Sequence, residues 1–256
     1  MAESTQPAGI RRVAPPAETK EPRLASGLAG LWGALLTLGS GATTVALIEH
    51  NTEWIPAWVV VTLLYGVGSW GLLTRRHWSR AFGAGLSLFA VAACAQCVYA
   101  LGPLPTTLVA GGVHVVWLLL LFFVRGAQTR REGLSMVAAS IALMPAVGFA
   151  LAPEQTGGVM IAVLAGAGIL LLGTMGLARG RTWGLLLALI GAPVLAVSVL
   201  HAPSLSHFTG PHAFVGQPLQ PLMLDALGVV AAAAAVCAVL PYLVPMVRFL
   251  FRPQPA

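Results

Sequence analysis

The chain has 256 residues, of which 57% are hydrophobic and only 9% are charged. A soluble globular domain uses about 25% charged residues to cover its surface, so this composition excludes an ordinary water-soluble protein. The net charge of +6 comes from arginines in short clusters between apolar runs, a pattern that indicates membrane topology rather than a nucleic-acid-binding face. We therefore expect the lipid bilayer, and not nucleic acid, as the chain's surroundings.

Residues 1–24 contain several prolines and charges and few large apolar side chains, so we expect a disordered cytoplasmic tail. A helix needs about 20 apolar residues to cross a hydrocarbon core of about 30 Å. Such runs recur eight times, at about 26–48, 54–73, 81–102, 106–124, 133–152, 158–178, 183–201 and 222–248. The sequence therefore predicts an all-α, polytopic transmembrane helix bundle of about eight spans over residues 25–250, followed by a short cytoplasmic C-terminus at 251–256.

The charges indicate the orientation of these spans. With the N-terminus inside, all 14 basic residues fall in the tail, the second, fourth and sixth connections and the C-terminus, whereas the outer connections carry Glu49, Glu53 and Glu154. The positive-inside rule then predicts that both termini are cytoplasmic. Abundant Ala, Gly, Leu and Arg, with Lys20 as the only lysine, is typical of a GC-rich bacterial genome. We therefore expect the plasma (inner) membrane of a bacterium.

A weak internal repeat has an offset of 105 residues. The segment Gly71-Leu72, followed by Arg76 and Trp78, matches Gly176-Leu177, followed by Arg181 and Trp183. An even number of spans separates the two segments, so a duplication would give two four-helix units in parallel orientation, as in some transporters. The alternative is a generic inner hairpin, with Trp at the interface and Arg beside it.

Cys94 and Cys97 form a CxxC motif near the outer end of the third apolar run, followed by Tyr99. The motif resembles that of membrane thiol oxidoreductases of the disulfide-bond and vitamin-K-reductase type. In those families it lies at a helix start, where the dipole favours a thiolate. Here it lies in the last turns, where the dipole has the opposite sign, and a second cysteine pair is missing. We interpret both cysteines as packing residues on a face of small side chains, with catalysis as the alternative.

His114 lies near the middle of the fourth apolar run. An ionisable residue at that depth is a functional candidate, because a neutral imidazole can bind haem or a metal or join two helices. Ligation of haem by two histidines needs a second one at similar depth, and no other run has one. The simpler interpretation is a hydrogen bond between helices.

Histidines also gather on the outer side. The last outer connection, with its edges, contains His201, His207 and His212, and His50 and Asp225 lie on the same side. Imidazole and carboxylate suit zinc or copper, which makes these residues candidate ligands for a divalent metal. Their spacings match no rigid ligand pattern, and a solvated loop stiffened by proline is the alternative.

Three functions of different classes remain open. The first is a non-enzymatic membrane subunit or accessory protein that packs against a membrane-protein partner or a second copy of itself. The second is a permease for a neutral or apolar small solute. The third is a thiol-redox protein, or one linked to a metal or haem, using the residues above. No span carries a carboxylate in its centre, which counts against an ion-coupled permease.

Overall fold

The computed structural model describes residues 23–50, 52, 55–124, 129–151, 157–179, 181–201 and 221–250. These residues form eight helices: α1 (Arg23–His50), α2 (Ile55–Leu73), α3 (Ser79–Leu101), α4 (Pro105–Phe123), α5 (Arg130–Ala150), α6 (Gly157–Ala178), α7 (Thr182–Leu200) and α8 (Pro221–Leu250). The all-helical prediction is confirmed, and every helix begins and ends within a few residues of its expected bounds. The tail and the short C-terminus stay predictions, because residues 1–22 and 251–256 lie outside the described part.

Six of the eight helices are long and apolar enough to cross a membrane: α1, α2, α3, α4, α6 and α7. The described side chains of α8 form a shorter apolar stretch, Gly228–Leu243. Helix α5 begins with three charged residues, Arg130 to Glu132, which lower its mean hydropathy. Its start is fixed by a capping box, in which the Thr129 side chain and the Glu132 side chain each bond the other residue's backbone N–H. The structure is thus that of a multi-pass membrane protein.

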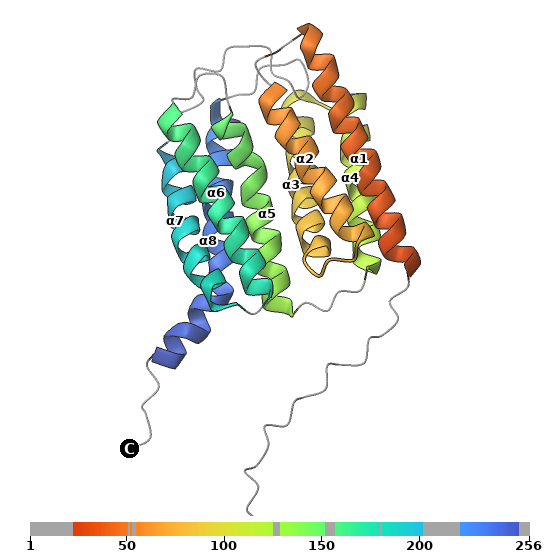
Figure 1. Ribbon diagram of the computed structural model, residues 1–256. Helices are drawn as coiled ribbons and strands as arrows, with labels where there is room; N and C mark the ends of the chain where they lie inside the picture. Colours follow the sequence, from red (N-terminus) through yellow and green to blue (C-terminus); the bar gives the residue numbers. More distant parts are fainter. Residues whose placement is uncertain are drawn as a thin grey trace, which may run out of the picture.

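The helices form two groups of four that stand side by side (Figure 1). In the first unit, defined as α1–α4, α1 packs against α2 and α4, and α3 packs against the same two helices. In the second unit, α5–α8, α6 packs against α5 and α7, and α8 closes the ring against the same two helices. The main contact between the units is the seam between α3 and α5.

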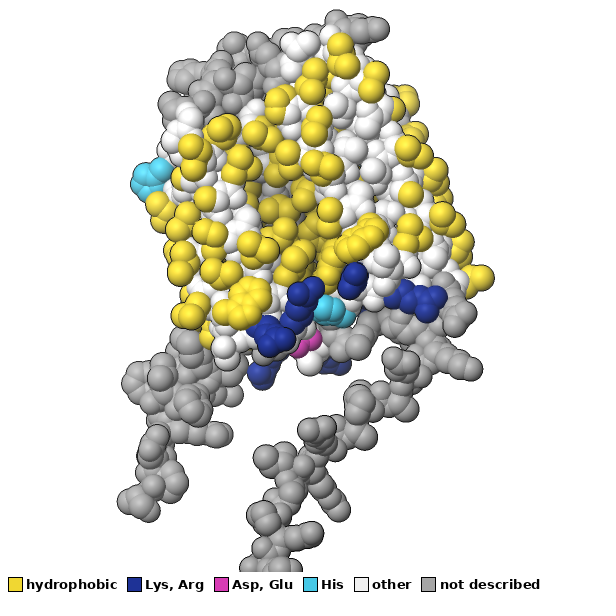
Figure 2. Space-filling model, viewed as in Figure 1, with side chains coloured by type: hydrophobic (Ala, Val, Ile, Leu, Met, Phe, Trp, Pro, Cys, Tyr) yellow, Lys and Arg dark blue, Asp and Glu magenta, His cyan; other side chains and the backbone are white. Residues whose placement is uncertain are grey.

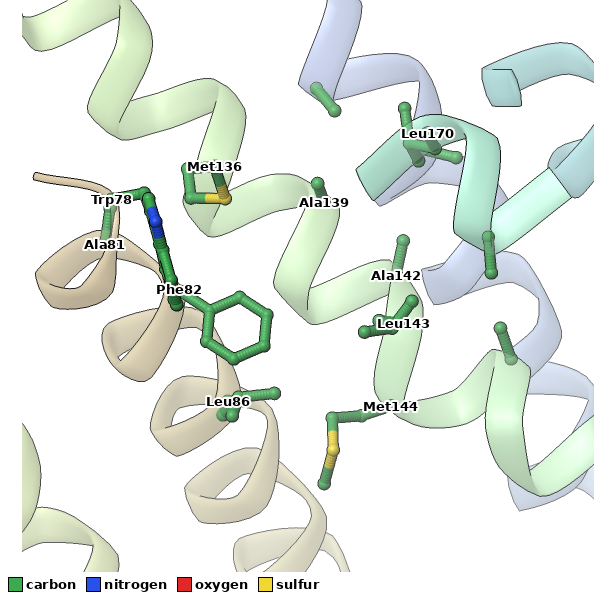
Figure 3. Close-up of a cluster of buried hydrophobic side chains, with 14 of the residues drawn as sticks. Trp78, Ala81, Phe82, Leu86, Met136, Ala139, Ala142, Leu143, Met144 and Leu170 are labelled. Carbon is green, nitrogen blue, oxygen red and sulfur yellow. The ribbon is translucent and has the colours of Figure 1, made fainter. Parts of the chain in front are cut away.

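Apolar side chains fill the seam. Phe82 and Leu86 of α3 point toward Met136 and Met144 of α5, and all four side chains are buried (Figure 3). The two backbones also come close together, since a Cβ atom added at Gly85 would lie 2.5 Å from the carbonyl oxygen of Val137. The two units therefore share one continuous core.

Small residues of α6, among them Gly166, Gly173 and Gly176, bring α6 and α7 into close contact. A Cβ atom at Gly166 would lie 2.7 Å from the backbone nitrogen of Leu195, and one at Gly173 would overlap the backbone of Ala188. Membrane helices associate through such close packing, because lipid provides no hydrophobic force between them.

The turns α2–α3 and α6–α7 are built alike. The N–H of Arg76 donates to the carbonyl of Gly71 at 2.7 Å, and the N–H of Arg181 donates to that of Gly176 at 3.0 Å. A Cβ atom at either glycine would also lie 2.8 Å from the nearest ring atom of the tryptophan seven positions later. The matched residues are 105 positions apart, so the sequence repeat corresponds to a repeated local structure.

The surface of the bundle divides into an apolar wall and one charged end. Figure 2 shows hydrophobic side chains over most of the visible face and arginines gathered at a single end, together with a histidine and an acidic side chain. The arginines with described side chains lie in or beside the even-numbered connections: Arg75, Arg76, Arg80, Arg130, Arg131, Arg179 and Arg181. Helix α1 begins and α8 ends at this same arginine end (Figure 1).

Candidate functional site

A hydrogen-bonded pair of polar side chains lies inside the first unit. The hydroxyl of Tyr65, from the middle of α2, is 2.7 Å from Nε2 of His114, from the middle of α4. The other ring nitrogen of His114, Nδ1, lies 2.7 Å from the carbonyl oxygen of Ala110, one turn earlier in the same helix. Both nitrogens of the imidazole are therefore engaged.

The partners determine the arrangement of hydrogens for a neutral ring. A carbonyl oxygen only accepts, so Nδ1 of His114 must donate to Ala110. A neutral imidazole then has an unprotonated Nε2, which accepts the hydroxyl hydrogen of Tyr65. This arrangement satisfies all three groups without a charge in the apolar interior. The pair works as a hydrogen bond between helices, the simpler of the two interpretations expected for His114.

Three further hydrogen bonds tie α1 to the same region. The indole N–H of Trp117, one turn after His114, donates to the carbonyl of Ala29 at 2.9 Å. The indole N–H of Trp32 donates in the opposite direction, to the carbonyl of Val113 at 2.9 Å. From α2, the Ser69 hydroxyl donates to the carbonyl of Gly30 at 2.7 Å. Together with the Tyr65–His114 pair, these bonds form what we call the polar lock of α1, α2 and α4.

Binding of haem or a metal by His114 would break one of the hydrogen bonds of its ring. Ligation through Nε2 requires Tyr65 to give up its hydrogen bond, and ligation through Nδ1 requires the same of Ala110. The ring of Tyr65 is 4% exposed and also packs against Trp117, with ring centroids 5.8 Å apart. The local geometry therefore suits a bond between helices better than a ligand to a cofactor.

The two cysteines of the CxxC motif are free thiols in the last turns of α3, and both are half-buried. Cys94 faces α4, because a Cβ atom added at Gly111 would lie 3.4 Å from the Cβ of Cys94. Further along the same face, Gly83 lies against Trp117 and Leu121 of α4. The face of small residues thus packs α3 against α4, and Cys94 takes part in that packing.

The outer histidines are only partly within the described structure. His201 ends α7, is exposed, and its Nδ1 lies 2.9 Å from the carbonyl of Val197. His207 and His212 lie outside the described residues, as do the side chains of His50 and Asp225. Within the described part, no group of three or more His, Cys, Asp or Glu side chains is arranged to hold a metal ion. The metal site therefore stays a prediction.

The arginine end contains a histidine that the sequence analysis did not single out. His77 lies in the turn between α2 and α3, and its Nε2 is buried without a hydrogen-bond partner among the described residues. Burial lowers the pKa of His77, the positive charges of Arg179 and Arg76 lower it further, and the carboxylate of Glu132 partly opposes them. His77 therefore lies where both units contribute charge.

Two other arginine contacts shape this end of the bundle. The guanidinium of Arg76 lies over the ring of Trp70, 5.1 Å from its centroid. Nε of Arg80 donates to the carbonyl of Leu121 at 3.1 Å, in the last turn of α4, where this carbonyl also accepts the backbone N–H of Val124 at 3.3 Å. Arginines at this end thus also have structural roles.

No family model, curated protein or solved structure matches the chain. The residues themselves must therefore carry the assignment of function.

Tyr65 and His77 were missed because a tyrosine in an apolar run and a histidine in a turn are ordinary in sequence. A signal for Tyr65 was available, since a polar residue at mid-depth in one span needs a partner in another.

Proposed function

We propose that the protein is a non-enzymatic membrane subunit or accessory protein, which packs against a membrane-protein partner or a second copy of itself. The observation that carries the proposal is the engagement of both ring nitrogens of His114, by Tyr65 and by Ala110. His114 lies in the middle of α4, and its bond to Tyr65 connects α4 to α2, whereas its bond to Ala110 lies within α4. Its arrangement serves assembly of the bundle and leaves no nitrogen free for a reaction or a ligand.

The proposal includes the orientation of the helices in the membrane. All eight helices cross the membrane, and the arginine end faces the cytoplasm, with both termini on that side. Support comes from the gathering of arginines at one end of the bundle (Figure 2) and from the even number of helices between the two ends of the chain. Helix α5 has charges only in its first turn, and α8 packs against α5 and α7. We place the protein in the plasma membrane of a bacterium.

Co-purification tests the assignment. A tagged copy is extracted from its native membrane in a mild detergent, and the polypeptides that stay with it are weighed by native mass spectrometry. We expect a partner polypeptide, or a second copy, in stoichiometric amount. The tagged chain recovered alone as a monomer, from membranes in which it is stable, would overturn the proposal.

A permease for a neutral or apolar solute is the second candidate, and one observation favours it. The α2–α3 and α6–α7 turns share the backbone hydrogen bond from arginine to glycine and the Gly–Trp contact at an offset of 105 residues. This is what a duplicated four-helix unit gives, and parallel repeats occur in transporters. Proteoliposomes loaded with a panel of neutral solutes distinguish the candidates: flux that depends on the protein favours the permease.

A further inference from the structure

The arginine end has an unusual feature at the seam between the two units. Nε2 of His77 is buried and has no hydrogen-bond partner in the part of the chain that the structure describes. Buried ring nitrogens nearly always have a partner in folded proteins, either a protein group or a bound molecule. A polar group from outside the chain would satisfy this nitrogen.

The charges around His77 indicate the kind of group. Arg76 precedes it in the α2–α3 turn of the first unit, and Arg179 follows α6 in the second unit; both act electrostatically on its ring. Glu132, at the start of α5, is the acidic group that acts on the same ring. Its carboxylate already accepts the backbone N–H of Thr129 at 2.9 Å in the capping box. The positive charge at the seam therefore exceeds the negative charge.

The level of Arg76 and Trp70 along the bundle indicates the source of the polar group that would bind His77. Trp70, beneath the guanidinium of Arg76, is 51% exposed on the apolar wall of the bundle. A tryptophan next to an arginine at the end of an apolar helix lies at the level of lipid headgroups. An arginine held on an indole ring there keeps its N–H groups available at that level.

We propose that the arginine end of the seam binds the phosphate group of an anionic phospholipid, held by Arg76 and Arg179 with His77 as a further donor. Arginine suits this task because its N–H groups match phosphate oxygens in pairs. His77 donates from Nε2 when its ring is protonated, and a bound phosphate makes that protonation favourable. Because one arginine comes from each unit, the lipid also joins the two units at the end of the seam. The inference does not depend on the proposed function.

The chain offers a matched control within the same two turns. The test variant is Arg76→Gln with Arg179→Gln, and the control is Arg75→Gln with Arg181→Gln. Both remove two positive charges, one from each unit, from exposed arginines. Of these four arginines, Arg76 and Arg179 are the two that act electrostatically on His77. A general attraction of the arginine end for anionic lipid is therefore separated from a defined site.

The full-length protein in mild detergent is titrated with phosphatidylglycerol or phosphatidylcholine of identical acyl chains, and retained lipid is counted by native mass spectrometry. We expect the natural sequence to retain phosphatidylglycerol preferentially. The test variant should bind it about thirtyfold less tightly, since an arginine near an anionic headgroup contributes roughly 1 kcal/mol. The control should lose little. Equal retention of both lipids, or equal loss in both variants, would overturn the proposal.

Two further measurements distinguish a lipid from free phosphate and test the role of His77. Excess inorganic phosphate should displace little of the lipid; complete displacement would show a site for free phosphate and would contradict the assignment to a lipid. Retention of phosphatidylglycerol should also increase as the pH is lowered below the ordinary pKa of histidine, and His77→Gln should remove that increase. A pH response that persists unchanged in His77→Gln would remove His77 from the site.

Discussion

The hydroxyl of Tyr65 and Nε2 of His114 lie 2.7 Å apart and join the middle of α2 to the middle of α4. The same stretch of α4 is tied to α1 through Trp117 and Ala29. A polar residue in an apolar span needs such a partner, because no water is present there to satisfy it. The polar lock therefore explains why a tyrosine and a histidine occur at mid-depth in helices that are otherwise apolar.

Loss of the Tyr65 hydroxyl should weaken the bundle. Tyr65→Phe leaves Nε2 of His114 without its partner, and hydrogen bonds between membrane helices contribute roughly 0.6 kcal/mol on average and up to about 1.7. We expect a decrease of about 1 kcal/mol in the free energy of unfolding, measured by denaturant titration in detergent micelles. Tyr99→Phe is the control, because Tyr99 is 93% exposed. Equal stability of the two variants would show that the bond contributes nothing.

Packing between α6 and α7 gives a second prediction. A side chain at Gly173 would overlap the backbone of Ala188, whereas one at Gly168, on the same helix, would meet no atom within 4 Å. Gly173→Ala should lower the free energy of unfolding by about 1–3 kcal/mol, as overpacked cores do. Gly168→Ala should leave it unchanged or slightly raised. Unfolding of both variants at the same denaturant concentration would contradict the close contact between α6 and α7.

The lowered pKa of His77 predicts how stability changes with pH. The unfolded chain has a histidine of ordinary pKa, near 6.5, whereas the folded chain protonates His77 only at lower pH. As the pH falls below that ordinary value, the unfolded state binds the proton first, so stability decreases. Melting in detergent without anionic lipid should show this decrease, and His77→Gln should reduce it. A larger decrease in the variant would contradict the direction of the shift.

The cysteines give a prediction that separates packing from catalysis. Cys94 faces Gly111 across the α3–α4 interface, whereas Cys237 is exposed. Cys94→Ala combined with Cys97→Ala should leave stability and partner binding unchanged. Cys94→Leu should destabilise the protein, because the larger side chain has to enter that interface, and Cys237→Leu should not. If the double alanine variant stays folded but loses the protein's cellular activity, the cysteines carry chemistry.

The helices could be predicted from the sequence because the signal is one of length and charge. Each apolar run is long enough to span, and arginines mark every second connection, so both the bounds and the gathering of arginines follow from composition along the chain. The turn at Gly71 was recognisable for a similar reason. Its residues recur at Gly176, and the structure repeats with them.

The polar lock could not be predicted in the same way. Whether Tyr65 reaches His114 depends on how α2 and α4 rotate about their axes and how close they come, which is set by side-chain packing across the whole first unit. All-round apolar helices give no periodic signal for that rotation. His77 was missed for a related reason, since Arg179 and Glu132, which act electrostatically on it, belong to the second unit and lie far away in sequence.

The central claim is that all eight helices cross the membrane with the arginine end in the cytoplasm, and cysteine labelling on intact cells tests it most directly. In a chain whose native cysteines are replaced by alanine, single cysteines are introduced as Thr52→Cys, Pro103→Cys, Arg130→Cys and Arg181→Cys, or appended after Ala256. All four substituted residues are exposed. We expect a membrane-impermeant maleimide to label the first two in intact cells and the others only after permeabilisation. Labelling of Arg130→Cys and Arg181→Cys on opposite sides would show that α5 or α6 does not cross, and labelling of the appended cysteine in intact cells would contradict the assignment of α8.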